Sequence, residues 1–204
     1  MTLTQSTRFF VAAAAFCSVA SASEVFNFDS DSLGTSTTFT DTVNGLSATF
    51  SSTADPGGFI VYGSLFDTLT GNVLGDPGPA GANGLALDIT FSQNLSAIVL
   101  DFATADFGAS SPLTITAYEN STETGSATAT GTVPVGFTFP EGAVGLSGAT
   151  FNEIVVSSSA PDFAVDNISA SLAPEPAAFG LLGLGLVAIG SPAVYRKSRR
   201  AAIK

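Results

Sequence analysis

The chain has 204 residues, with 17 Asp and Glu, six Lys and Arg and no His, and its formal net charge is −11. All six basic residues lie at position 8 or within 196–204, so residues 23–173 contain 16 acidic residues and no Lys, Arg, His or Cys. This segment argues against nucleic-acid binding, which needs Lys or Arg to neutralise phosphates, and it excludes disulfide bonds. It also excludes catalytic sites built on His, Cys, Lys or Arg, and leaves only carboxylate pairs of the kind that glycosidases use.

A secretory signal peptide is expected at residues 1–22. Arg8 and the terminal amine give a weakly positive start, and the apolar run that follows is too short to cross a bilayer. The small residues Ala20 and Ala22 precede Ser23, as in the cleavage sites of signal peptidases. We therefore expect the chain to be exported and this segment to be removed.

Residues 23–173 are predicted to form one all-β domain, a β-sandwich of jelly-roll type. The segment is rich in Thr, Ser, Val, Ile and Phe, and the alternation of apolar and polar residues is clearest at 85–91. Turn sequences such as Asn44-Gly45 separate the apolar segments, and no part of the domain has a helical period. In chain order we expect strands at 25–28, 37–42, 46–52, 59–62, 85–91, 97–102, 113–118, 128–133, 151–156 and 163–172.

Alternating polar residues at the start of the domain suggest a cation site. Asn27, Asp29 and Asp31 offer the amide and carboxylate oxygens that calcium prefers, although they do not form an EF-hand loop. The alternative is that these three residues are solvated at the edge of a sheet.

Acidic residues also bracket apolar ones near the end of the domain. In a strand, Phe163 and Val165 point to one face, whereas Asp162, Ala164 and Asp166 point to the other. The simplest interpretation is an apolar face toward the core and a polar face toward solvent.

Residues 174–200 combine three features in order. Pro174-Glu175-Pro176 is followed by an uncharged apolar run at 177–195 and by a basic cluster within 196–200. As a helix the run would extend roughly 28 Å, close to the hydrocarbon thickness of a bilayer. A basic cluster directly after the run favours a transmembrane helix with a cytoplasmic C-terminal side over a buried core helix. The cluster consists of Arg196, Lys197, Arg199 and Arg200.

This order of tripeptide, apolar span and basic cluster resembles the PEP-CTERM sorting signal of Gram-negative bacteria. The same segment is also labelled an ice-binding protein C-terminal domain, which does not imply that this chain binds ice. The resemblance implies recognition by an exosortase, a membrane cysteine transpeptidase, with cleavage near Pro174–Pro176. It also implies a single-pass inner-membrane intermediate with a cytoplasmic C-terminus, and then a place at the cell envelope surface or in the extracellular matrix.

A second resemblance concerns the domain itself. The order of the segments 87–92, 97–102 and 162–168 is similar to the ectodomains of many PEP-CTERM proteins, which resemble the jelly-roll modules of carbohydrate-binding families. In such modules the first and last strands often hold a structural calcium ion. The resemblance therefore implies Asp29 and Asp166 as calcium ligands.

These observations lead to an expected function with two alternatives. We expect a non-catalytic exported protein of the envelope or extracellular matrix, with extracellular polysaccharide, an exosortase and the membrane as partners. The first alternative is a purely structural or adhesive surface protein without a specific ligand. The second is a carbohydrate-active enzyme that uses two carboxylates, one of them with a raised pKa.

Overall fold

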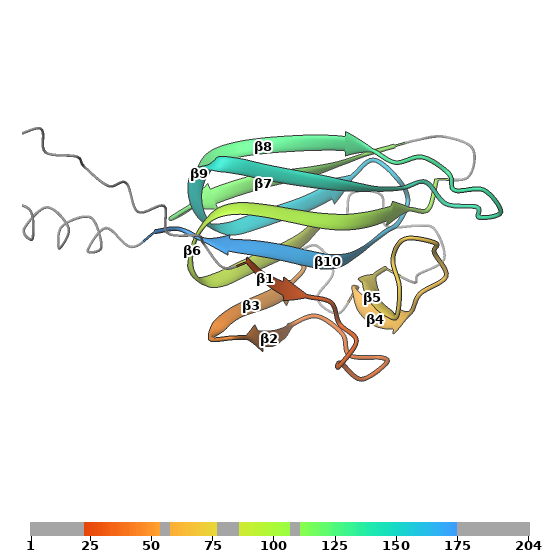
Figure 1. The fold of residues 1–204 in the computed structure, drawn as a ribbon, viewed down its shortest axis with the longest axis horizontal. Coiled ribbons are helices and arrows are strands. Elements are labelled where there is room, and N and C mark those ends of the chain that lie inside the picture. The colour runs from red at the N-terminus through yellow and green to blue at the C-terminus, as the bar shows by residue number, and fades with distance from the viewer. Residues whose placement is uncertain (1–22, 54–57, 77–85, 107–110, 175–204) are drawn as a thin grey trace, which may run out of the picture.

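The computed structural model describes residues 23–53, 58–76, 86–106 and 111–174, and within these ranges it contains ten β-strands and no α-helix (Figure 1). All ten strands join one antiparallel hydrogen-bonded sheet, which confirms the prediction of an all-β fold. In chain order the strands are β1 (Ser23–Phe26), β2 (Phe39–Val43), β3 (Leu46–Ser51), β4 (Ile60–Gly63), β5 (Asn72–Gly75), β6 (Ala86–Thr104), β7 (Pro112–Glu119), β8 (Thr122–Thr130), β9 (Glu141–Ser158) and β10 (Phe163–Leu172).

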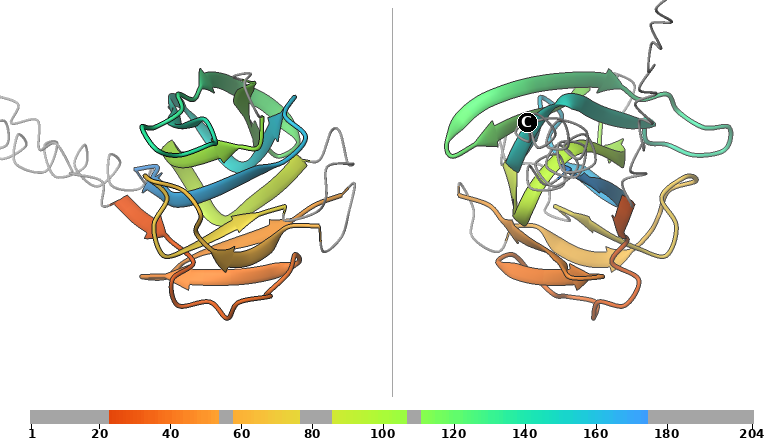
Figure 2. Two further views of the ribbon diagram at one scale, coloured as in Figure 1. Left: turned by 90° about the vertical axis from the view of Figure 1, so that its right-hand side faces the viewer. Right: turned by 60° about the vertical axis from the view of Figure 1, so that its left-hand side comes forward.

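The long strands β6 and β9 fold this sheet into two layers. They pair with each other along nearly their full lengths, with register shifts near Leu95, where the ribbon turns back (Figures 1 and 2). The first half of β6 also pairs with β3, and the second half of β9 pairs with β7. The second half of β6 pairs instead with β10, which carries β1 and β5. The β6–β9 ribbon therefore contributes to both layers.

The interior between the layers is rich in phenylalanine. The ring centroid of Phe26 lies 6.3 Å from those of Phe50 and Phe91, and Phe28 lies 5.2 Å from Phe50. These four side chains are at most 4% exposed, and they connect β1 of one layer with β3 and β6 of the other. Burying a side chain of this size stabilises a fold by about 1.5–3 kcal/mol. The packing confirms the predicted β-sandwich of jelly-roll type.

Several strands differ from the sequence-based expectation, and β8 begins at Thr122 where a strand was expected at 128–133. The segments expected at 85–91 and 97–102 form one continuous strand, β6, and β5 was not predicted at all. The first half of β9 was also missed, because its glycines are typical of a loop. A Cβ atom at Gly145 would lie 2.9 Å from Cγ2 of Val99, so glycine is what lets β9 approach β6 here.

The face of β10 that points away from the main core is covered by the β4–β5 hairpin. β5 pairs with β10 at Ala164 and Val165, and the loop at 64–71 lies over the same region. Ala164 is 1% exposed and Asp166 is fully buried, so the interpretation of this face as polar and solvated is wrong. A second, smaller apolar cluster occupies it and consists of Leu69, Val73, Ala103 and Ala164, with Tyr62 and Phe66 against it.

Some predicted features lie outside the described residues. These are the signal peptide at 1–22, the apolar run at 177–195, the basic cluster at 196–200, and Glu175 and Pro176 of the sorting tripeptide. Within the described ranges the structure contains no helix that could span a membrane.

Candidate functional site

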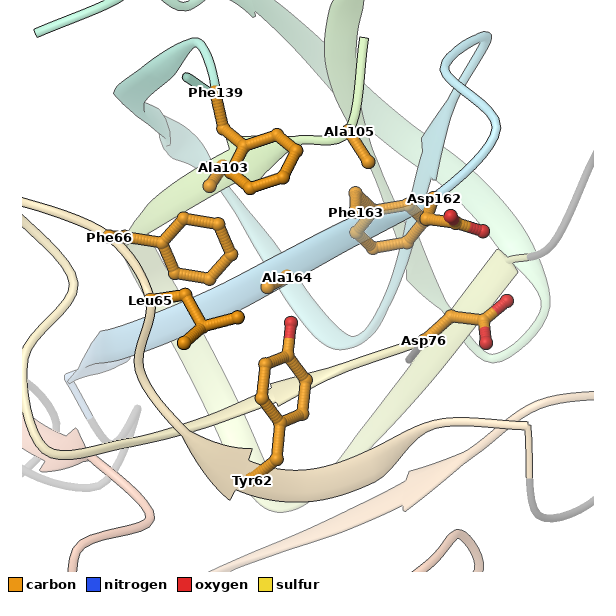
Figure 3. A pocket seen from close by; sticks show the side chains of 10 residues that line it. All are labelled: Tyr62, Leu65, Phe66, Asp76, Ala103, Ala105, Phe139, Asp162, Phe163 and Ala164. Atoms are coloured by element: carbon orange, nitrogen blue, oxygen red, sulfur yellow. The ribbon is translucent and has the colours of Figure 1, made fainter. Parts of the chain in front are cut away.

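A cleft of about 300 Å³ opens between β10 and the β4–β5 hairpin (Figure 3). Most of its lining is apolar or aromatic, and its ionisable groups are the phenol of Tyr62 and the carboxyls of Asp76 and Asp162. Figure 3 shows the two carboxyls on one side, Phe66 and Phe139 on the other, and the Tyr62 hydroxyl between them. The lining residues are Tyr62, Leu65, Phe66, Asp76, Ala103, Ala105, Phe139, Asp162, Phe163 and Ala164.

Backbone hydrogen bonds bring the two carboxyls to the same side. The N–H of Asp76, just after β5, donates to the carbonyl oxygen of Phe163 at 3.2 Å. The N–H of Ala105, just after β6, donates to the carbonyl oxygen of Asp162 at 2.9 Å. The ends of β5 and β6 and the start of β10 therefore meet at this side of the cleft.

Glu141 holds the aromatic side of the cleft in place. Glu141 is 4% exposed, and its carboxylate accepts hydrogen bonds from the N–H of Asp67 at 2.9 Å and from the N–H of Thr68 at 2.7 Å. The Thr68 hydroxyl donates a third, at 2.6 Å. Phe66 directly precedes this anchored segment, and its ring centroid lies 5.7 Å from that of Phe139 in an edge-to-face arrangement.

The charges around the cleft are all negative. Burial raises the pKa of Tyr62 to about 12, and the charges of Asp162 and Asp76 act in the same direction. Burial also raises the pKa of Asp162, with a further contribution from the charge of Asp76. Oδ1 of Asp162 is buried and accepts no hydrogen bond from the described part of the chain. Because residues 23–174 contain no Lys, Arg or His, a cation that balances these carboxyls must come from outside the domain.

The charge of Asp29 acts on the carboxyl of Asp166, and these are the two residues named as calcium ligands. Burial raises the pKa of Asp166 to about 7; the charges of Asp29 and Asp101 add to this shift, and the backbone N–H groups of Asn167 and Thr70 oppose it, although the Thr70 N–H does not reach a carboxylate oxygen with hydrogen-bond geometry. Asp166 is fully buried, and its Oδ2 accepts no hydrogen bond from the residues that the structure describes. The position thus combines a buried carboxyl, an unpaired oxygen and a neighbouring carboxylate.

A β-bulge lies directly beside Asp166. The pairing of β10 with β6 passes from Asp166 opposite Asp101 to Ser169 opposite Val99, so β10 contains one extra residue. Asn167 in this bulge has a φ of 48°, and its N–H donates to Oδ1 of Asp166 at 2.7 Å. Bulges commonly re-aim a side chain at a functional site, which is consistent with the inward orientation of Asp166.

Asp29 lies in the loop that follows β1, and this loop is tied to the start of β5. Oδ1 of Asp29 accepts a hydrogen bond from the N–H of Asn72 at 2.9 Å, and the Asn72 amide donates to the carbonyl oxygen of Asp31 at 3.2 Å. Oδ2 of Asp31 is buried and has no hydrogen-bond partner in the described ranges. Asn27 is exposed, and its Oδ1 accepts a hydrogen bond from the N–H of Asp29 at 3.4 Å.

These residues do not form a complete carboxylate cage. The described ranges contain no group of three or more His, Cys, Asp and Glu side chains placed to hold a metal ion. A calcium site on Asp29 and Asp166 would therefore draw on backbone carbonyl oxygens or water, since calcium takes about six to eight oxygen ligands.

The cleft was not identified from the sequence. Tyr62, Phe66, Asp76 and Phe139 come from separate segments with no common spacing, and they meet through the pairing of β5 with β10 and through the hydrogen bonds of Glu141 to the 64–71 loop. The only local signal was the presence of aromatic side chains in otherwise polar connections. Asp162 was noted for its alternation with Phe163 and Val165, and it proves to line this cleft.

Solved structures that are similar to this chain include two carbohydrate-binding modules and a glucanase. A family 11 carbohydrate-binding module from Clostridium thermocellum, solved with a β-1,3-1,4-mixed-linked tetrasaccharide, is 10% identical, with a TM-score of 0.37 over 76% of this chain and 99% of that one. A family 6 carbohydrate-binding module is 16% identical, with a TM-score of 0.34 over 57% of this chain and 83% of that one. The catalytic domain of a GH87 α-1,3-glucanase is 14% identical, with a TM-score of 0.35 over 63% of this chain.

The match spans only 28% of the glucanase chain. All three TM-scores are low, so nothing about the ligand of this chain follows from them. No curated protein sequence matches the chain.

A family comparison concerns the C-terminal region. Residues 172–200 match the PEP-CTERM protein-sorting motif. This match covers Pro174-Glu175-Pro176, the apolar run and the basic cluster, and it confirms the resemblance that the sequence suggested. The chain therefore carries a PEP-CTERM protein-sorting motif at residues 172–200, which indicates an exported protein with a C-terminal sorting signal.

Proposed function

We propose that this protein is a non-catalytic component of the cell envelope or extracellular matrix that binds extracellular polysaccharide through the cleft beside β10. The sorting motif supports a substrate relationship with an exosortase, which would process the chain near Pro174–Pro176. Residues 177–195 would hold it in the membrane before processing.

The observation that carries this proposal is the composition of the cleft. Aromatic faces suit the apolar faces of sugar rings, and a few polar groups fix the orientation of a bound ligand. The cleft provides Tyr62, Phe66 and Phe139 for the first purpose and Asp76 and Asp162 for the second. Its volume of about 300 Å³ is at the small end for ligand sites, which suits one sugar unit of a longer chain.

A structural calcium ion is part of the proposal. Asp29 and Asp166 would supply carboxylate oxygens, and the unpaired, buried Oδ2 of Asp166 is the atom whose environment most needs a cation. The ion would stabilise the charged form of Asp166 that burial disfavours, and it would join the loop after β1 to β10. Its role would be structural and not catalytic.

A two-carboxylate glycosidase is a second candidate, because one specific observation favours it. Asp76 and Asp162 share the cleft, and the pKa of Asp162 is raised, as a general acid requires. The small cleft volume favours binding over hydrolysis, since a hydrolase must hold sugar units on both sides of the cleaved bond. Release of reducing ends from a bound polysaccharide, abolished by Asp162→Asn, would establish the enzyme instead.

The proposal is tested by binding. Residues 23–174, which contain all ten strands and both apolar clusters, are applied with calcium to a glycan array and to the host's own extracellular polysaccharide. We expect saturable binding that free sugar competes away and that Phe66→Ala weakens. Absence of binding to both would leave a structural or adhesive surface protein without a specific ligand.

A further inference from the structure

The acidic groups of the cleft beside β10 favour ligands that carry a positive charge. Two carboxyls, Asp76 and Asp162, line it, and the domain offers no Lys, Arg or His to balance them. A ligand rich in uronate or sulfate groups would add like charges to a site that already repels them. A neutral sugar would leave the buried Oδ1 of Asp162 dependent on a hydroxyl alone.

The aromatic lining indicates what kind of cation fits. Figure 3 shows Phe66 and Phe139 on the side of the cleft opposite the two carboxyls, with the phenol of Tyr62 between them. Aromatic faces attract ammonium groups, and a carboxylate accepts a charge-assisted hydrogen bond from the same group. A small, hydrated metal ion would use only the carboxyl side, whereas an amino sugar would place its ring against the aromatic side and its ammonium group against the carboxyls.

We infer that the cleft binds the protonated amino sugar of a polysaccharide, a hexosamine with a free amino group. The ammonium lies on the side of Asp76 and Asp162, and the pyranose ring packs against Phe66 and Phe139. This inference rests on the proposed function, because it names the class of polysaccharide that the same cleft selects. It predicts that N-acetylation of the sugar, which removes the positive charge, removes the preference.

The test compares three tetrasaccharides with the same linkage and the same ring. Residues 23–174 are titrated calorimetrically with β-1,4-linked tetramers of glucosamine, of N-acetylglucosamine and of glucose, at a pH below the pKa of the sugar's own amino group. We expect the glucosamine tetramer to bind at least about tenfold more tightly than the other two, as loss of a hydrogen bond to a charged group implies. Raising the pH until the amino group is neutral should remove the difference.

Matched variants distinguish specific binding in the cleft from non-specific attraction of a cationic sugar to an acidic protein. Asp162→Asn and Asp76→Asn should each lower affinity for the glucosamine tetramer by about tenfold or more. Glu123→Gln removes one charge on the exposed surface of β8, outside the cleft, and should leave that affinity unchanged. An equal loss in all three variants would overturn the inference in favour of non-specific charge attraction.

The remaining outcomes distinguish failure of the amino-sugar inference from failure of the proposed function. Equal binding of all three tetramers would overturn the amino-sugar assignment and leave the proposed polysaccharide function standing. Binding of none of them, nor of any glycan on the array, would overturn both. If tetralysine bound as tightly as the glucosamine tetramer and lost its binding in Asp162→Asn, the site would be one for a basic peptide, and the sugar assignment would be wrong.

Discussion

Glu141 connects the first residue of β9 to the backbone of the loop at 64–71 through three hydrogen bonds. Replacement of Glu141 by Ala would remove the acceptor of the Asp67 and Thr68 N–H groups and of the Thr68 hydroxyl. We expect a loss of about 2–3 kcal/mol in the free energy of unfolding, measured by urea denaturation. Glu123→Ala, at an exposed position of β8, should change it by less than about 0.5 kcal/mol. Similar losses in both variants would contradict the anchoring role of Glu141.

Tyr62 provides a pH-dependent signal from inside the cleft. Its pKa is raised from 10.0 to about 12, so the folded protein keeps the phenol protonated over a range in which the unfolded chain ionises. The folded state then binds more protons than the unfolded state, and stability must fall as the pH rises above about 10. Tyr62→Phe should remove this loss, as followed by melting temperature from pH 9 to 12. A wild-type loss that persists in Tyr62→Phe would assign the effect to other groups.

Asp166 is the residue at which the calcium proposal can be tested. At a calcium concentration of 100 times the dissociation constant, a specific site adds about 2.7 kcal/mol, or roughly 5–10 °C in melting temperature for a domain of this size. We expect this shift with calcium relative to chelator, and its loss in Asp166→Asn. An equal shift with magnesium, or one retained in Asp166→Asn, would indicate general charge screening.

At the scale of the strands, the β4–β5 hairpin forms one wall of the cleft and depends on a close approach to β10. A Cβ atom at Gly75 would lie 2.8 Å from Cβ of Ala164 and 2.9 Å from the hydroxyl of Tyr62. Gly75→Ala should therefore cost about 1–3 kcal/mol in stability and weaken ligand binding by displacing Tyr62. Gly63 in β4 has no atom within 4 Å of its Cβ position, so Gly63→Ala is the matched control and should have little effect on either property. Comparable effects of the two substitutions in chemical denaturation would contradict this account.

The strands also show what the sequence could and could not predict. Alternation at 85–91 correctly predicted the first part of β6, because one of its faces meets the core and the other meets solvent. The first part of β9 escaped prediction, because Gly145 is required by a neighbour that lies 46 positions earlier in the chain, Val99. Asp166 was expected to face solvent, but it is fully buried, and the backbone of Thr70 in the β4–β5 loop lies against its carboxyl. Local patterns report local exposure, whereas coverage by a distant hairpin is set by the tertiary fold.

The same limit applies to the sites. The tail at 172–200 was recognised because its three features are contiguous in the chain. Asp29 and Asp166 were named from a resemblance, and the structure places their charges within reach of each other, which leaves calcium binding as a proposal. The cleft has no contiguous signature, since Tyr62, Asp76 and Phe139 meet only after folding.

At the scale of the whole molecule, the domain carries charge of one sign only. Residues 23–173 contain 16 acidic residues and no basic side chain, so added salt has no attractive side-chain ion pairs to screen. Salt should therefore only relieve repulsion, and the melting temperature should rise steadily as NaCl increases from low ionic strength. We expect the same rise with KCl, as measured by calorimetry. A fall in melting temperature with either salt would contradict the idea that repulsion dominates.

The direction of β10 determines which way the protein faces. Ser23 pairs with Ser171, so the two ends of the described domain lie side by side, and Asp162 and Phe163 stand at the opposite end of the strand. With a rise of about 3.3 Å per residue, the ten residues of β10 separate these poles by about 30 Å. In a molecule tethered through residues beyond 174, the cleft would lie at the end of the domain that points away from the attachment point. Trimming beyond residue 174 would shorten the tether and leave the cleft end of the domain intact.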